Sequence, residues 1–208
     1  MNKIIEKVKS FFKTDEIVIP TSVLVIICLV ITLALSGTNM LTKNKIANLE
    51  IQKKNTAMQK LISADEFKEE VITVQNDETG ESTEVKYNTA LKGGSVAGYI
   101  FTVATKGYGG DILVMTAVDT NCTVIAIEIL DASGETPGLG QNVTKANWYS
   151  QFNGLKEGIS VKKDGSANAE NNEINAVTGA TISSKGVTKA VNLALNYATQ
   201  ILEKGDKS

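Results

Sequence analysis

The amino-acid sequence predicts an α+β fold, in which an antiparallel sheet is flanked by helices and preceded by one N-terminal transmembrane helix. Three features of the 208-residue chain lead to this prediction: a long apolar segment near the N-terminus, a central run of alternating apolar and polar residues, and a terminal segment with helical spacing. Alternation with a period of two indicates strands. Strands that follow one another, with helices confined to the ends of the chain, are typical of the α+β class.

The N-terminal helix is predicted from the uncharged stretch between Glu16 and Lys43, within which Ile17 to Leu35 is almost wholly apolar. A helix needs about 20 such residues to cross a bilayer. A cleaved signal peptide is the alternative, but its apolar region is usually only about 7–15 residues long. We therefore expect a retained transmembrane helix over residues 17–36.

Lysines on either side of this span bear on its orientation. Four precede it within residues 1–16, and Lys43 and Lys45 follow it closely. Because an excess of positive charge marks the cytoplasmic end of a span, we expect the N-terminus inside the cell. Apolar residues of 1–16 share one helical face, which favours a cytoplasmic amphipathic segment on the inner membrane surface; a frayed terminus is the alternative.

The chain after the span is then extracytoplasmic. Residues 37–62 have a mostly polar helical pattern and are predicted to form a helical stalk, and residues 63–208 the extracytoplasmic domain. At the start of that domain, Ser63 and Glu66 have the spacing of a capping box, a pattern that begins helices.

The predicted sheet consists of five strands that share the period of two. They are Val71–Gln75, Glu84–Asn88, Val96–Thr105, Asp111–Val118 and Thr123–Leu130. Residues 119–121 read as a hairpin turn between the last two strands. Gly107, Gly109 and Gly110 mark another tight connection.

Helical patterns dominate the rest of the domain. Asn142 to Phe152 is predicted to be helical, with Trp148 and Phe152 in the core, and 162–173 is predicted to be a loop. From Ser183 onward, apolar residues recur at helical spacing until Gly205, which is typical of a helix end. The chain thus closes with a long amphipathic helix.

Composition excludes several kinds of chemistry. The formal net charge is −2, which gives no electrostatic basis for binding nucleic acid. The chain contains no His and no Arg, so Ser–His nucleophile pairs and histidine metal sites are excluded. Its two cysteines, Cys28 and Cys122, form no metal-binding pattern. No catalytic residue and no metal ligand is predicted.

The segment directly before the terminal helix, "TGAT" at 178–181, has the parts of a phosphate site. The free N–H groups and the dipole of a helix N-terminus attract anions. Gly179 and Ala180 allow the backbone to approach a ligand closely, and Thr178 and Thr181 supply hydroxyls. The alternative is purely structural, with Ser183 or Ser184 as a simple helix N-cap.

Four short motifs, taken together, carry a resemblance to a known family. They are "GYGGDI" at 107–112, "ETPGLG" at 135–140, "QF" at 151–152 and "TGATISS" at 178–184. With the single N-terminal span, they make the chain resemble the FMN-binding G subunit of the Rnf electron-transport complex and the related C subunit of the sodium-translocating NADH:quinone oxidoreductase. The length is closer to that of the Rnf protein.

The resemblance implies FMN bound covalently to Thr181 through a phosphodiester, with Thr178, Gly179 and Ala180 around the attachment point. A separate flavin transferase would attach it, using FAD and magnesium. The "ETPGLG" loop would contact the flavin through Thr136, Leu139 and Gly140, with Glu135 nearby and Tyr108 as a weaker candidate. A structural turn at Pro137-Gly138 is the alternative for this loop. Asn175 departs from the family pattern, which usually has an acidic residue six positions before the modified threonine.

The resemblance also implies a function: a membrane-anchored relay of electrons in an ion-translocating ferredoxin:NAD oxidoreductase, beside other membrane subunits of the Rnf complex. The absence of a GxGxxG motif and of a cysteine cluster agrees with a protein that binds neither NAD nor ferredoxin itself. Three alternatives stay open: the C subunit of the quinone reductase, an exported flavoprotein outside any ion pump, and a non-redox binding module.

Overall fold

The computed structural model describes residues 15–75 and 82–205. The chain divides into two compact units, Met1–Gln52 and Lys53–Ser208. The amphipathic segment predicted for 1–16 lies, except for its last two residues, outside the described part of the chain.

A single helix, α2 (Asp15–Leu61), contains both the predicted span and most of the predicted stalk. Within it, Val18–Lys43 is long and apolar enough to cross a membrane, by length and composition alone. Its hydroxyl side chains donate hydrogen bonds back to the helix: Thr32 Oγ1 lies 2.7 Å from the carbonyl oxygen of Cys28, and Thr38 Oγ1 lies 2.9 Å from that of Ala34. Such back-bonding satisfies hydroxyls that would be costly to place in an apolar medium.

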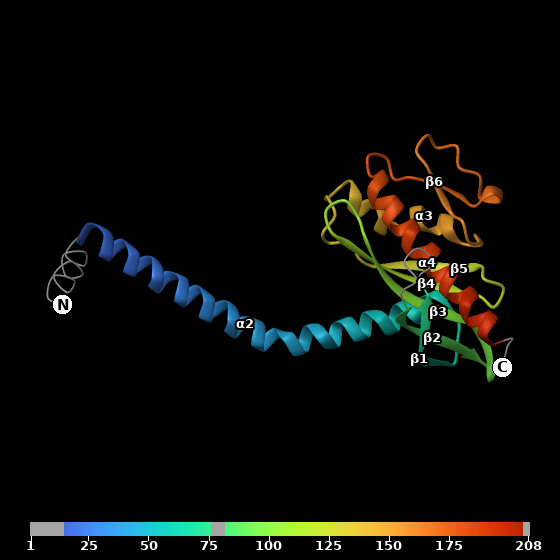
Figure 1. The fold of residues 1–208 in the computed structure, drawn as a ribbon, viewed down its shortest axis with the longest axis horizontal. Helices are drawn as coiled ribbons and strands as arrows, with labels where there is room; N and C mark the ends of the chain where they lie inside the picture. The colour runs from blue at the N-terminus through green and yellow to red at the C-terminus, as the bar shows by residue number, and fades with distance from the viewer. Residues whose placement is uncertain (1–14, 76–81, 206–208) are drawn as a thin grey trace. The chain divides into compact units, whose positions relative to one another are not determined.

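The second unit is built around a five-stranded sheet with every neighbouring pair antiparallel, in the order β1-β2-β3-β4-β5 (Figure 1). The strands are β1 (Glu66–Gln75), β2 (Ser82–Lys92), β3 (Ser95–Lys106), β4 (Asp111–Val118) and β5 (Val124–Asp131). The predicted antiparallel α+β class is confirmed. β4 has the predicted bounds, whereas β1 and β2 are longer than predicted.

The capping box predicted at Ser63 and Glu66 is wrong. Helix α2 ends at Leu61, and Glu66 is already the first residue of β1, paired with Leu91. The side chain of Asp65 instead accepts a hydrogen bond from the backbone N–H of Gly93, at 2.8 Å. Tertiary pairing with β2 therefore decides the conformation here, against the local helix signal.

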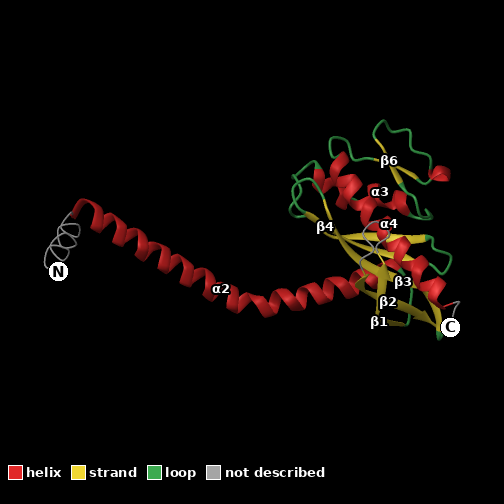
Figure 2. Cartoon of the chain, viewed as in Figure 1, coloured by secondary structure: helices red, strands yellow, loops and turns green. Residues whose placement is uncertain are grey.

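Helices cover both faces of the sheet in the second unit. On one face lies α4 (Thr181–Gly205), which contacts β3 and β4 (Figures 1 and 2). On the other face, Ala57, Met58 and Leu61 from the end of α2 pack with Met115 and other buried residues of the sheet. Alternate residues of a strand point to opposite faces. Val114 of β4 therefore packs in the cluster that includes α4, and its neighbour Met115 packs in the cluster that includes the end of α2.

The segment after β5 is predicted as one helix over Asn142–Phe152, but it forms three short pieces. They are η1 (Gly140–Thr144), α3 (Ala146–Tyr149) and η2 (Ser150–Phe152). The break after η1 falls at Lys145, whose extended backbone (φ −77°, ψ 125°) interrupts the helical turn. Trp148 and Phe152 are buried, with ring centroids 5.7 Å apart, so their predicted place in the core is confirmed.

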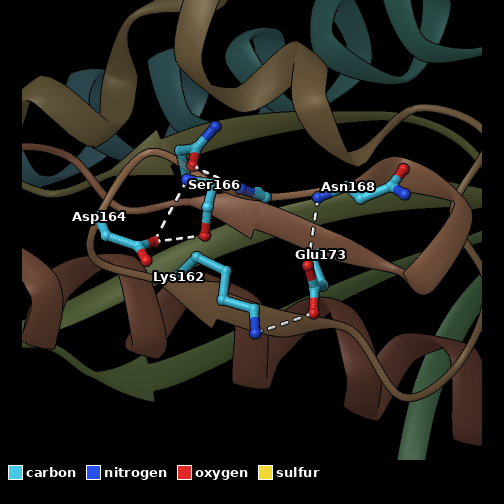
Figure 3. Close-up of polar contacts among 7 residues, drawn as sticks. Lys162, Asp164, Ser166, Asn168 and Glu173 are labelled. Carbon is cyan, nitrogen blue, oxygen red and sulfur yellow. Dashed lines mark hydrogen bonds and ion pairs between the residues drawn. The ribbon is translucent and has the colours of Figure 1, made fainter.

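The predicted loop 162–173 is more ordered than expected. It runs between β6 (Ser160–Lys162) and β7 (Glu173–Asn175), which form a short parallel pair, and it contains η3 (Ala169–Asn171). Polar contacts hold it, as Figure 3 shows: Lys162 Nζ lies 3.0 Å from Glu173 Oε1, and Asp164 Oδ1 accepts from Ser166 Oγ at 2.6 Å. Strands of three residues leave too short a pattern to be read from sequence.

Candidate functional site

A cavity of about 410 Å³ lies where the β3–β4 turn, the loop after β5 and the beginning of α4 meet. Three segments far apart in the sequence therefore form one site. Its walls are Tyr108, Glu135, Thr136, Leu139, Gly140, Gly179, Ala180, Thr181, Ile182 and Ser183.

Glu135 is the buried centre of this arrangement, with 2% of its surface exposed. Its Oε2 accepts a short hydrogen bond from Ser183 Oγ in the first turn of α4, and its Oε1 accepts one from the backbone N–H of Gly109 at 3.0 Å. One carboxylate thus ties its own loop to both the helix and the β3–β4 turn.

Opposing effects set the protonation state of Glu135. Burial raises the pKa of its carboxyl, but hydrogen bonds from Ser183 and from the backbone N–H groups of Gly109, Gly110 and Tyr108 lower it by more. Donors aimed at a carboxylate favour its charged form. The net pKa lies below its usual range, so Glu135 is ionised at neutral pH.

Glycines make room for this carboxylate. A Cβ at Gly107 would collide with Glu135 Oε1, and a Cβ at Gly140 would collide with Glu135 Oε2 and come within 2.9 Å of Ser183 Oγ. Gly107 and Gly140 are therefore required by the close approach of the buried Glu135 side chain, whereas a Cβ at Gly109 would collide with the backbone oxygen of Gly134.

Helix α4 presents its N-terminus to the cavity. Its first intrahelical hydrogen bond runs from Ser184 N to Ala180 O, at 3.0 Å. The N–H groups of Thr181, Ile182 and Ser183 precede it and have no intrahelical acceptor. Thr181, the first residue of the helix, is half-buried and lines the cavity. A hydroxyl and free N–H groups therefore meet at one wall.

Neither serine acts as the simple N-cap that is the structural alternative. Ser183 Oγ donates to Glu135, whereas Ser184 Oγ accepts from Val177 N and donates to Ala180 O, both at 2.9 Å. Gly179, just before the helix, has φ +76°, a left-handed conformation that residues with side chains rarely adopt. It brings the backbone against Leu139, since a Cβ there would lie 3.1 Å from Leu139 Cδ2.

The mouth of the cavity carries exposed apolar side chains. Tyr108, Ile182 and Leu139 are 71%, 53% and 46% exposed. They lie around one opening and come from three different segments. Such a group of exposed apolar side chains around a pocket is typical of a ligand-binding site.

The structure brings eight of the nine predicted cofactor residues to this cavity, and Thr178 is the exception. Thr178 is exposed in the turn before α4 and is not among the lining residues. Two lining residues, Ile182 and Ser183, are not predicted from the sequence to bind a cofactor. Helical periodicity alone places Ser183 near the start of α4, but its partner Glu135 is 48 positions away in the sequence and has no local signal.

Asn175, the residue that departs from the family pattern, lies at the end of β7 and has structural contacts of its own. Its Oδ1 accepts from the backbone N–H of Ala167 at 3.1 Å, and its carbonyl oxygen accepts from Trp148 Nε1 at 2.8 Å. Its backbone N–H donates to Gln151 Oε1 at 2.9 Å. Asn175 thus joins the 162–173 segment to α3 and η2.

Comparison with known proteins agrees with this geometry. Residues 107–196, which include all three segments of the cavity, match the FMN-binding domain family. The G subunit of the proton-translocating ferredoxin:NAD(+) oxidoreductase complex of Clostridium ljungdahlii is 34% identical, over 86% of this chain and 90% of that protein. The chain belongs to the family of Rnf G subunits.

Further members and solved structures bear on this assignment. The corresponding protein of Acetobacterium woodii, named as part of a Na(+)-translocating ferredoxin:NAD(+) oxidoreductase complex, is 33% identical over 83% of this chain and 87% of that protein. The crystal structure of NqrC from Shewanella oneidensis has a TM-score of 0.51 at 19% identity, covering 66% of this chain and 70% of that one. The C subunit of the Na(+)-translocating NADH-quinone reductase from Parabacteroides distasonis has a TM-score of 0.52 at 24% identity, covering 65% and 78%. These two likenesses concern the fold.

Proposed function

We propose that this chain is the membrane-anchored electron-transfer G subunit of an Rnf-type ion-translocating ferredoxin:NAD oxidoreductase, with FMN bound covalently to Thr181 through a phosphodiester. The observation that carries the proposal is the position of Thr181. It is the first residue of α4, beside free backbone N–H groups, in the wall of a cavity with an apolar mouth. The N–H groups suit the phosphate of a phosphorylated aromatic cofactor, and the apolar mouth suits its ring.

The residues fit FMN by their chemistry. The N–H groups at the start of α4 suit the phosphate, because a helix N-terminus favours negative charge. Leu139, Ile182 and Tyr108 offer apolar surface for the ring, and Thr136 and Gly140 lie beside them. When bound, the isoalloxazine ring supplies transfer of electrons singly or in pairs, and the protein supplies position and access.

Glu135 has a positioning role in this proposal. Its carboxylate is ionised and is already engaged by Ser183 and by the N–H groups of the β3–β4 turn. We therefore assign it to holding the three walls of the cavity together, and not to activating Thr181. Threonine is a weak nucleophile without an adjacent base, which agrees with attachment by a separate flavin transferase using FAD and magnesium.

Asn175 bears on that attachment, because the family pattern usually has an acidic residue at this position. An amide cannot take up a proton or bind magnesium as a carboxylate does. Asn175 Oδ1 is occupied by the N–H of Ala167. We propose that it serves the fold of the 162–173 segment and that the transferase supplies the acidic group.

Helix α2 would anchor the chain as a single-pass protein, with a cytoplasmic N-terminus and residues 63–208 on the extracytoplasmic side. Its candidate span, Val18–Lys43, and the back-bonded hydroxyls within it support a membrane-embedded helix. The chain would relay electrons between other Rnf subunits, because its sequence contains neither a dinucleotide-binding GxGxxG motif nor a cysteine cluster.

In-gel fluorescence tests the proposal. Protein from a host that has the flavin transferase should give a fluorescent band after denaturation, and Thr181→Ala should give none. Thr178→Ala is the matched control, because this threonine lies three positions away and does not line the cavity. It should keep its fluorescence. Fluorescence of the Thr181→Ala variant equal to that of the wild type would overturn the assignment.

A further inference from the structure

A second hollow, of about 510 Å³, lies beside the cofactor cavity, between the end of β3 and α4. One wall is the end of β3 with Lys106, and the other is α4 with Ile182, Lys185, Lys189 and Leu193. We call it the lysine groove. Ile182 lines both hollows, so the groove opens next to the cavity wall that contains Thr181.

The groove is cationic although the chain as a whole has a net charge of −2. From Thr181 to Gln200, the only charged residues of α4 are Lys185 and Lys189, both exposed. Lys106 lies 3.1 Å from Asp111 Oδ1. Among the described residues, no carboxylate lies within ion-pair distance of Lys185 or Lys189.

This placement has a cost for the helix. Lysines four positions apart lie on the same helical face, and a like-charge pair at this spacing is destabilising by a few tenths of a kcal/mol. No ion pair with a carboxylate of the described residues offsets this repulsion for either lysine. An anionic partner outside the chain would offset it.

We propose that the lysine groove docks an acidic surface of the flavin transferase that modifies Thr181, an inference that rests on the proposed function. The charge of the groove selects an anionic partner. Its continuity with the cavity through Ile182 places that partner at the threonine to be modified.

The nature of the groove favours a transient protein partner. Stable subunit interfaces are more apolar and are depleted in lysine, whereas exposed charges mainly speed the encounter of partners that later separate. A modifying enzyme must separate from its product. The groove is also hollow, and the apolar side chains of Ile182 and Leu193 in its lining suit a projecting protein segment better than a flat lipid surface.

The modification itself is a balanced group transfer. The Thr181 Oγ–P bond forms on the FMN phosphorus of FAD, the pyrophosphate P–O bond breaks, and AMP leaves. The hydroxyl proton passes to a base of the transferase or to solvent. The donor is itself anionic at its pyrophosphate, so positive charge beside Thr181 would attract both the transferase and its substrate.

The test measures the rate of flavinylation of the full-length chain in detergent, with purified transferase, FAD and magnesium, followed by intact mass. The variants are Lys185→Glu/Lys189→Glu and the charge-preserving Lys185→Arg/Lys189→Arg. Lys156→Glu/Lys163→Glu is the control. Both of these lysines are exposed and lie outside the groove, and replacing them changes the net charge by the same amount.

We expect charge reversal in the groove to lower the second-order rate constant by about tenfold at low salt. The arginine variant and the control should react at the wild-type rate. The difference should shrink at about 1 M salt, where the Debye length falls to about 3 Å. Circular dichroism and the melting temperature check that each variant is folded.

Other outcomes separate the two levels of the proposal. A wild-type chain that is never modified overturns the proposed function and the docking surface together. A wild type that is modified, with groove variants reacting equally fast, overturns the docking surface alone. Unchanged flavinylation combined with lost binding to vesicles containing anionic lipid would assign the groove to the membrane and overturn the proposal.

Discussion

The hydrogen bond between Ser183 and Glu135 makes a prediction about stability that does not depend on any cofactor. In Ser183→Ala, the buried carboxylate loses its side-chain donor and keeps only backbone N–H groups. A hydrogen bond to a charged group contributes about 1.5–3 kcal/mol. Ser183 and Glu135 are 1% and 2% exposed, so the carboxylate has little contact with solvent to compensate for the lost donor. We expect a loss of about 1.5–3 kcal/mol in the free energy of unfolding.

The assay is thermal unfolding of the full-length chain in detergent, followed by circular dichroism. For a domain of about 150–250 residues, 1 kcal/mol corresponds to about 2–4 °C, so the melting temperature should fall by about 3–12 °C. Ser166→Ala is the matched control. Its hydroxyl also donates to a carboxylate, Asp164 Oδ1 at 2.6 Å, but both residues are exposed. We expect less than about 0.5 kcal/mol there.

The pH dependence gives the same prediction a second readout. The pKa of Glu135 is lowered in the folded state, so its contribution to stability is present above the unfolded pKa of about 4.3 and is lost as pH falls toward the folded pKa. Removing Ser183 removes one cause of that lowering. The acid loss of stability should therefore be smaller in Ser183→Ala and should end at a higher pH than in the wild type. A variant as stable as Ser166→Ala, with an unchanged acid transition, would refute the reasoning.

Three further predictions concern the site and the topology. Leu139→Asp should keep covalent flavin but lower its midpoint potential by about 20 mV, because a half-exposed charge repels added negative charge by about 1 kcal/mol; a redox titration against Leu139→Asn checks this, and equal potentials would contradict it. Gly140→Ala should destabilise the fold by about 2 kcal/mol or more, since the new methyl group meets Glu135 Oε2, and a melting temperature equal to that of the wild type would contradict the close packing of Gly140 against Glu135. Protease added outside cells without an outer barrier should digest residues 43–208, and protection of that region would reverse the proposed topology.

Local patterns in the sequence are enough to predict much of the fold. The largely apolar run from Ile112 to Val118 gives β4 its bounds, because apolar residues lie on both faces and Asp111 and Asp119 stand at its ends. β1 begins earlier than predicted because Glu66–Glu70 is polar and takes strand form only through its pairing with β2. The parallel pair β6–β7 escapes prediction because each strand has only three residues.

The candidate site also has a part that local motifs predict and a part that depends on tertiary packing. The motifs predicted to bind the cofactor, in the loop after β5 and at the start of α4, do lie together around one cavity. What the sequence leaves out is how they are joined. The contact of Glu135 with Ser183 spans 48 positions, and the glycines that accommodate Glu135 come from two separate turns. Such contacts depend on tertiary packing, which no local pattern encodes.

Covalent flavin at Thr181 is the central claim, and intact-mass spectrometry of the protein isolated from its native membrane tests it most directly. We expect one species, heavier than the unmodified chain by the mass of FMN less one water. Tandem fragmentation should locate the added mass on the peptide that contains Thr178 and Thr181, at Thr181. An unmodified mass in protein from flavin-replete cells, or an adduct at any other residue, would contradict the claim.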